Sequence, residues 1–171
     1  MSDIFTKYLI LLYMSFTKHK GTDNYITCKE DWFRIKDYIP NDKVIWCPFF
    51  CDGSQKKYFK EMGFDVIHQD EDFFQKNRGG CCIDNPPFSK IKDVFMRLKD
   101  LNKPFIIIAR PVLLGCKWFQ DAFKDGLQLI IPSKRVYFYH LENQKKKYTP
   151  PFGTFYYCWK MGLEKDLIFI D

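Results

Sequence analysis

The residues best suited to chemistry are Asn85, Pro86, Pro87 and Phe88, which directly follow the short apolar run 80–83. The two prolines fix φ, so the chain must leave the predicted strand extended at its carboxyl end, where open α/β sheets bind ligands. Asn85 can offer its amide oxygen and Pro86 its carbonyl oxygen to one planar amino group, while Phe88 supplies a flat face for stacking. Two acceptors that hold the hydrogens of an exocyclic amine favour its pyramidal, nucleophilic form. The pattern therefore predicts amine alkylation.

The segment 84–88, Asp-Asn-Pro-Pro-Phe, resembles the Asp/Asn/Ser-Pro-Pro-Tyr/Phe signature of the amino-methyltransferases, above all the N6-adenine enzymes. These enzymes belong to the S-adenosylmethionine-dependent Rossmann-like superfamily. The resemblance implies catalytic roles for Asn85, Pro86, Pro87 and Phe88, with S-adenosylmethionine as the cofactor. A proline turn after a strand is the alternative for these residues taken alone.

The preceding segment 44–54 predicts a strand, a turn of small residues and the start of a helix, which is the geometry of a nucleotide-type site. It looks like the cofactor loop of the same family, in which Asp-Pro-Phe is often followed by a small residue and glycine. This chain has Cys47 where an acid is common and one glycine where two are usual; an ordinary Asp-Gly-Ser turn is the alternative. The resemblance implies cofactor contacts from Cys47, Pro48, Phe49, Asp52, Gly53 and Asn85.

Acidic residues follow the next predicted strand, residues 63–68. An acid about 20 residues after a dinucleotide-type loop commonly accepts hydrogen bonds from ribose hydroxyls, and Asp70 lies 22 positions after Pro48. The resemblance then implies Asp70 for the ribose, and Asp72 with Phe73 for the adenine end of the cofactor. A solvated acidic loop is the alternative.

A further partial match lies upstream, at residues 25–32. Several of these methyltransferases carry a Thr-Pro-like segment that closes over the methionine part of the cofactor, and here Cys28 replaces the proline. The resemblance implies cofactor contacts from Thr27 and Trp32. Alternatively, Thr27 caps a helix together with Glu30, three positions on.

Apolar runs and helical periodicity alternate along the chain. They predict helices over 55–62, 90–101 (capped by Ser89) and 116–123, and strands over 104–109, 127–131, 135–140, 154–159 and 167–170. This order predicts an α/β fold: a mostly parallel central sheet with an antiparallel edge and helices on both faces, which the resemblance makes a Rossmann-like methyltransferase fold. About 12 residues separate Asp72 from Asp84, so the third strand of the family is expected to be short or absent.

Length and composition predict one compact enzyme. The 171 residues are 46% hydrophobic, with residues 1–24 expected to form an appended helix and loop and residues 25–171 the catalytic domain. No run reaches the roughly 20 apolar residues of a membrane span. Seven cysteines, mostly in apolar stretches and without paired metal-ligand spacing, favour reduced thiols, an intracellular (cytoplasmic or nuclear) protein and no metal site.

The formal net charge of +6 favours a polyanionic partner. The predicted nucleic-acid contacts are concentrated in two places, Lys134 with Arg135, and a basic hairpin tip at 142–148. A solvated loop that prevents edge pairing is the alternative for that tip. The following Pro-Phe-Gly-Thr, residues 151–154, resembles a turn that the family places beside the target pocket. The expected contacts are Lys134, Arg135, Lys145, Lys146 and Lys147.

Together these patterns predict methyl transfer to the N6 amine of adenine in DNA. RNA adenine is the nearest alternative, because related enzymes act there and single strands avoid the cost of extruding a base. A catalytically inactive, methyltransferase-shaped subunit that binds nucleic acid or a partner is another, since the glycine loop is weakened. A protein glutamine is the third. No target-recognition domain is visible, so loose specificity or a partner protein that supplies it is expected.

Overall fold

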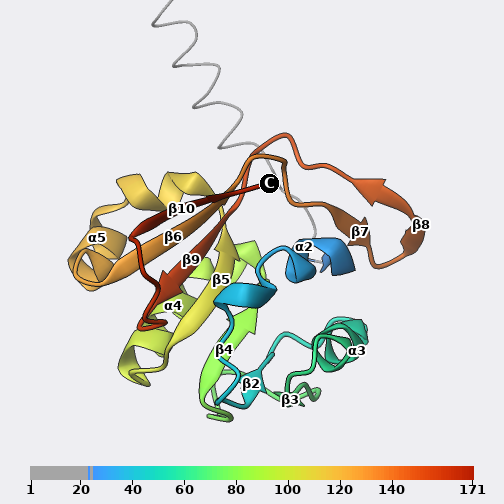
Figure 1. Cartoon of the computed structure of the whole chain (residues 1–171), viewed down its shortest axis with the longest axis horizontal. Helices are drawn as coiled ribbons and strands as arrows, with labels where there is room; N and C mark the ends of the chain where they lie inside the picture. The colour runs from blue at the N-terminus through green and yellow to red at the C-terminus, as the bar shows by residue number, and fades with distance from the viewer. Residues whose placement is uncertain (1–22, 24) are drawn as a thin grey trace, which may run out of the picture.

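The computed structural model describes Asp23 and residues 25–171 (Figure 1). The helix and loop expected over residues 1–24 therefore lie outside the described residues, apart from Asp23. None of the helices in the described part is long and apolar enough to cross a membrane.

The described helices and strands follow the predicted alternation, with boundaries shifted by a few residues. The α-helices are α2 (Lys29–Phe33), α3 (Ser54–Glu61), α4 (Ile91–Asp100) and α5 (Lys117–Phe123), and 3-10 turns lie at Lys36–Tyr38, Phe88–Lys90 and Pro111–Gly115. The strands are β1 (Tyr25–Thr27), β2 (Ile45–Trp46), β3 (Val66–Ile67), β4 (Cys81–Asp84), β5 (Phe105–Ala109), β6 (Leu127–Pro132), β7 (Phe138–His140), β8 (Asn143–Tyr148), β9 (Phe155–Trp159) and β10 (Leu167–Ile170).

Seven strands form a mixed, mostly parallel sheet in the order β10-β6-β9-β5-β4-β2-β3. Strands β3, β2, β4 and β5 pair in parallel, as do β6 and β10. Strand β9 is antiparallel to both of its neighbours, β5 and β6. The predicted antiparallel edge is therefore wrong in its position, because β9 lies inside the sheet. Its side chains at Tyr156, Tyr157 and Cys158 are fully buried, as two covered faces require, whereas every second residue of β10 is exposed.

Helices cover both faces of this sheet, as predicted. On one face α2 and α3 bury Trp32 and Phe59 against strand residues such as Ile83. On the other face α4 and α5 bury Phe95 and Phe119 against the alternate strand residues. Each helix therefore contributes an apolar stripe to a separate core layer.

The chain passes from β3 to β4 without another strand or helix, so the expectation of a short or absent third strand is confirmed. A turn takes its place, in which Asp72 Oδ1 accepts a hydrogen bond from the amide of Phe74 at 2.9 Å. This Asx turn is formed within the segment itself and needs no tertiary partner.

A second, small sheet in the order β1-β7-β8 lies beside α2 (Figure 1). Residues 142–148 were expected to be a hairpin tip, but Asn143–Tyr148 form β8, which pairs antiparallel with β7. The aromatic pairs explain this strand: Phe138 lies opposite Tyr148, and the Tyr148 ring stacks on Tyr25 with 5.4 Å between centroids. A run of lysines thus occupies a strand because its neighbours supply the apolar contacts.

Two predicted helix caps are wrong. Thr27 ends β1, Cys28 precedes α2, and no side chain caps this helix. Ser89 lies within a 3-10 turn before α4, and its hydroxyl donates to the carboxylate of Asp23 instead. The Ser89 hydroxyl thus makes a tertiary contact in place of the cap that its residue type favours, whereas Thr27 is held in β1 by pairing with Phe138.

Candidate active site

The predicted chemical residues gather at one edge of the central sheet, because parallel strands end at the same edge. The loop after β2, the Asn-Pro-Pro-Phe segment after β4 and Arg110 after β5 all leave from there. Strand β9 runs the other way, and its first residue Phe155 pairs with Ala109 at the end of β5. The turn 150–153 therefore also reaches this edge.

Asp84 connects the loop after β2 with the segment after β4. Its Oδ2 accepts a hydrogen bond from the Phe49 amide and its Oδ1 one from the Asn85 amide, both at 2.8 Å. The carboxyl is only 1% exposed, and burial raises its pKa to about 7, although both amides and the Gln55 side chain favour the charged form. Asp84 thus sets the position of both loops relative to each other.

Gln55 supports the same junction from α3. Its Nε2 donates to the Ile83 carbonyl at 3.2 Å, and its side chain also bonds to the Asp84 carboxyl. The sequence pattern gave neither Asp84 nor Gln55 a role. For Asp84 the sequence did hold a signal: an acid at the end of a wholly apolar strand is buried, and a buried carboxyl needs hydrogen-bond donors around it.

The proposed amine clamp has the backbone course that its prolines predict. Pro87 has φ −59° and ψ 120°, and Phe88 begins the 3-10 turn that precedes α4. Pro86 is buried, Asn85 and Phe88 are half-buried, and the Oδ1 atom of Asn85 is buried without a hydrogen-bond partner. Such an acceptor lacks the donor that an amine could provide.

Phe88 belongs to an aromatic and cationic group that sequence reasoning found only in part. The Phe88 and Phe152 rings lie 6.1 Å apart, so the structure brings the Pro-Phe-Gly turn to the clamp, as the resemblance implied. The Arg110 guanidinium lies 5.4 Å from the Phe152 ring and 6.0 Å from the Phe88 ring. Tyr157 donates its hydroxyl proton to the Arg110 carbonyl at 2.9 Å. Arg110 was missed because a single arginine after a strand carries no sequence signal.

The loop after β2 has the turn that was expected before α3. Gly53 has φ +80°, and Asp52 Oδ1 accepts hydrogen bonds from the amide and the hydroxyl of Ser54, at 3.0 and 2.7 Å. Cys47 and Pro48 are buried beneath the loop, and burial raises the pKa of the Cys47 thiol well above its ordinary value. Asp52 therefore holds the turn, while Cys47 occupies a core position.

The ring of Phe50 lies between this loop and the end of β3. It stacks on His68 with 5.0 Å between centroids, and a Cβ added at Gly53 would meet it at 3.0 Å. His68 Nδ1 is 2.7 Å from the Cys47 carbonyl oxygen, which can only accept, so the ring proton lies on Nδ1. The His68 Nε2 atom is then a buried acceptor without a partner, and burial lowers the pKa of this imidazole.

The acidic segment after β3 divides into exposed and buried residues. Asp70 and Asp72 are exposed, and Asp72 is engaged in the turn described above. Phe73 is 4% exposed and packs against Trp46 and Phe49, with ring centroids 5.4 and 5.1 Å away. Phe73 is thus part of the core beside the loop, and His68 is the polar side chain that follows β3 directly.

Thr27 and Trp32 are both buried and both lack a polar partner. The Trp32 ring packs against Phe59 and Tyr156, but its Nε1 donates to nothing, and the same holds for Thr27 Oγ1. Thr154, just before β9, has an unpaired hydroxyl as well. An unpaired buried polar group costs about 1–3 kcal/mol.

These unpaired atoms test how well the predicted residues fit S-adenosylmethionine. Seven side chains in the described part of the chain hold such atoms. Three of them, Thr27, Trp32 and Asn85, were predicted to contact the cofactor, and His68 and Thr154 follow or precede strands at the same edge. A hydroxyl, an indole N–H and an amide oxygen suit the polar groups of an amino-acid nucleoside. The residues fit, although a ligand reaches these atoms only when the covering groups move.

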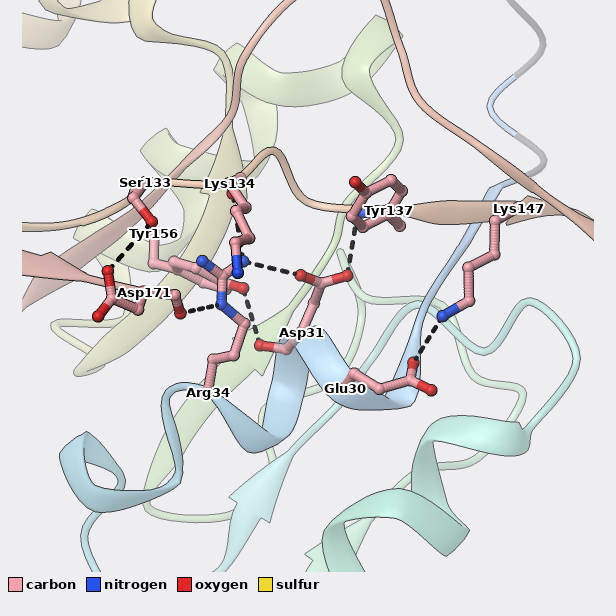
Figure 2. A network of polar contacts seen from close by, with 9 residues as sticks. All are labelled: Glu30, Asp31, Arg34, Ser133, Lys134, Tyr137, Lys147, Tyr156 and Asp171. Atoms are coloured by element: carbon pink, nitrogen blue, oxygen red, sulfur yellow. Dashed lines mark hydrogen bonds and ion pairs between the residues drawn. The ribbon is translucent and has the colours of Figure 1, made fainter.

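The predicted basic contacts lie beside a buried polar network (Figure 2). Asp31, 2% exposed, accepts from Arg34 Nη1 at 3.1 Å and from the Tyr137 amide at 2.9 Å, and burial raises its pKa. Arg34 also donates to the main-chain oxygens of Lys134 and Asp171, at 3.2 and 2.7 Å. This network connects α2 with the segment between β6 and β7 and with the end of β10.

The basic residues themselves divide into three cases. Lys134 is exposed beside Arg34, and Arg135 donates to the Pro150 carbonyl at 3.0 Å, next to the Phe152 turn. Lys147 pairs with Glu30 at 3.4 Å, as Figure 2 shows, and Lys146 is exposed. The side chain of Lys145 lies outside the described residues.

In the described part of the chain, no group of three or more His, Cys, Asp and Glu side chains is placed to hold a metal ion. No protein-family model, no curated protein and no solved structure matches this chain.

Proposed function

We propose that this chain transfers the methyl group of S-adenosylmethionine to the N6 amine of adenine in nucleic acid, with DNA as the first choice and RNA as the second. The observation that carries the proposal is the stiff exit from β4, where Asn85 presents an unpaired amide oxygen beside the loop after β2. Asp84 holds these two segments together. The mixed, mostly parallel sheet with its inserted antiparallel strand suits a Rossmann-like methyltransferase fold.

The clamp acts on the nucleophile. An aromatic amine is a weak nucleophile because its lone pair is delocalised into the ring. Asn85 Oδ1 and the Pro86 carbonyl accept the two amine hydrogens, and this favours the pyramidal form that exists only as the new bond forms. Phe88 and Phe152 provide aromatic surface for the base.

The cofactor supplies an electrophilic methyl group on a sulfonium. Thr27, Trp32 and Asn85 would hold its polar groups, and Gly53 allows the backbone of the loop to come close. Asp70 is the expected partner of the ribose hydroxyls. The remaining expected contacts, from Cys47 to Asp52 and at Phe73, act by shaping the loop.

No general base is required before the attack. The amine becomes strongly acidic once the fourth bond to nitrogen forms, so its proton leaves to solvent afterwards. Asp84 is not the base, because both of its oxygens face the amides of Phe49 and Asn85. The rate enhancement then comes from alignment and from the two fixed acceptors.

Arg110 gives the site a contact for the nucleic-acid backbone. The Arg110 guanidinium lies against two aromatic rings of the site, and arginine recognises a phosphate with two parallel hydrogen bonds. We assign to Arg110 the phosphate next to the target base. Arg135, whose side chain bonds to Pro150, supports the adjoining turn.

One observation favours the second candidate, a methyltransferase-shaped subunit that binds nucleic acid without catalysis. The Phe50 ring fills the space between Gly53 and His68, beside the loop that would hold the cofactor. An active enzyme must displace this ring, whereas an inactive subunit keeps it in place. Binding of S-adenosylmethionine to the whole chain in calorimetry separates these candidates.

The test of function offers tritiated S-adenosylmethionine in parallel with single-stranded DNA, duplex DNA, RNA and total protein. We expect label in adenine of nucleic acid, and we expect Asn85→Ala to lower the rate by about 10²–10³-fold, the usual effect of removing one fixed charge-stabilising group. Asn77→Ala, at an exposed asparagine after the Asp72 turn, is the matched control and should keep the wild-type rate. Label retained by Asn85→Ala at the wild-type rate would remove the clamp from the mechanism. Absence of both label and cofactor binding in the wild type would favour the inactive subunit.

A further inference from the structure

Lysines on three neighbouring elements lie on one side of the molecule, and most of them lie outside the residues that the sequence pattern assigned to nucleic acid. We define the lysine band as Lys56, Lys57 and Lys60 on α3, Lys29 on α2, and Lys146 and Lys147 on β8. In Figure 1 these three elements lie on the same side of the central sheet.

Ion pairs join the three elements into one surface. Lys29 on α2 pairs with Glu61 on α3, and Lys147 on β8 pairs with Glu30 on α2 at 3.4 Å (Figure 2). Six lysines against these two glutamates leave +4, which is two thirds of the formal net charge of +6. The band therefore holds most of the excess charge of the chain.

Helix α3 presents its lysines because its other face is committed to the core. Phe59 is fully buried, while Lys56, Lys57 and Lys60 are exposed. These three lysines, with Gly53 and Glu61, line a shallow surface hollow of about 560 Å³. The hollow begins at the loop after β2, four residues from the Phe49 amide that bonds to Asp84. The lysine face thus starts next to the candidate site.

Aromatic surface accompanies the charge. Phe33, at the end of α2, is 38% exposed, and the Lys29 ammonium lies 5.1 Å from its ring centroid. Cations beside an exposed ring suit a polynucleotide, which offers both phosphates and bases, better than an acidic protein. The eight residues of α3 extend about 12 Å, which spans three to four nucleotides at about 3.4 Å each.

We infer that the lysine band binds the phosphate backbone of the nucleic-acid strand that carries the target base, and so leads that strand across α3 and α2 to the clamp. The inference rests on the proposed function for the identity of the polyanion. It adds the path of the strand and names α3 as its principal contact, in place of a contact limited to β8 and the 134–135 segment.

The test measures binding alone, with no cofactor present. The triple variant Lys56→Gln, Lys57→Gln, Lys60→Gln is compared with the control triple Lys36→Gln, Lys124→Gln, Lys165→Gln, which removes the same charge from exposed lysines outside the band. Fluorescent oligonucleotides, single-stranded and duplex, are titrated with the whole chain between 50 and 200 mM salt, and circular dichroism checks the fold of each variant.

We expect the α3 triple to bind at least tenfold more weakly at 100 mM salt. Its salt slope should fall by about 2 on single strands, because each lost phosphate contact removes about 0.7. The salt slope of the control triple should fall by less than half as much as that of the α3 triple. Equal slopes for wild type and the α3 triple would overturn the inference, as would a loss as large in the control.

Two further arms separate this inference from the proposed function. Poly-glutamate bound as tightly as the oligonucleotides, with the same loss in the α3 triple, would show an acidic protein as the partner and overturn the inference. Salt-dependent nucleic-acid binding through α3 without any methyl transfer would support the band and count against catalysis.

Discussion

The most direct test of the junction beneath the site is the pH dependence of folding that Asp84 should cause. Burial raises its pKa from an ordinary value of 3.8 to about 7. The shift of about 3 units corresponds to about 4 kcal/mol between the two protonation states. Because the folded state binds the proton more tightly, this stability is fully present below pH 3.8 and is lost as the pH rises to about 7.

The substitution Asp84→Asn removes the titration and keeps the shape. The amide still accepts one hydrogen bond, but its NH2 group opposes the other amide donor, Phe49 or Asn85, so the variant is destabilised by a constant amount. The wild type should therefore lose stability relative to the variant as the pH rises, by up to about 4 kcal/mol between pH 4 and pH 8.

Urea unfolding of both proteins at pH 4, 5, 6, 7 and 8 measures this difference, and carbon NMR of the Asp84 carboxyl measures its titration directly. Asp93→Asn, at an exposed position of α4, controls for the removal of one negative charge. A free-energy difference between wild type and Asp84→Asn that changes by less than about 1 kcal/mol over this range would refute the reasoning. The carboxyl would then be reached by water, and the tight junction between the two loops would not exist.

Two further predictions concern the groups around the site. Gly53→Ala should lower the free energy of unfolding by about 1–2 kcal/mol because of its φ of +80°, and by a further amount because the added Cβ would lie 3.0 Å from the Phe50 ring. Gly63→Ala, at φ +95° with open space around it, isolates the backbone part in the same urea experiment; an equal loss in both would exclude the Phe50 contact. Arg110→Lys keeps the charge but not the planar fork, so we expect weaker binding of single-stranded DNA in the fluorescence titration, whereas Arg97→Lys on α4 should bind as the wild type does. Unchanged affinity of Arg110→Lys would remove the phosphate contact from the site.

The elements with strong local patterns could be predicted from the sequence. The apolar run of β5 and the amphipathic α4 are found where periodicity places them, because burial on two faces or on one face leaves a direct imprint on residue type. The gathering of the β2 loop and the Asn85 segment followed from the rule that parallel strands end at one edge. The position of β9 could not be predicted, because whether a strand lies at an edge or inside a sheet depends on the strands with which it pairs. The large aromatic side chains of Tyr156 and Tyr157 indicate burial but not those neighbours.

Side-chain partners were the least predictable level. Thr27 and Ser89 have the residue type of helix caps, but Thr27 is paired in β1 and the Ser89 hydroxyl bonds to Asp23. A cap contributes only about 1 kcal/mol, so such pairing or contacts can outweigh it. The lysine run in β8 was predicted to be a loop, since Tyr25, whose ring stacks on Tyr148, is distant in sequence. Arg110 and Gln55 gave no local signal, because their roles arise only where separate loops meet.

The unpaired buried polar atoms lower the stability of the folded chain, and the proposed cofactor site offers a reason for their presence. Thr27, Trp32, Asn85 and His68 each lower the stability of the folded chain as long as their buried polar atoms lack partners. Apolar residues of similar shape would remove this cost, so stability alone gives no reason for polar groups at these positions. A ligand that offers a donor to Asn85 Oδ1 and an acceptor to Trp32 Nε1 gives such a reason, because the cost then becomes part of the binding selectivity.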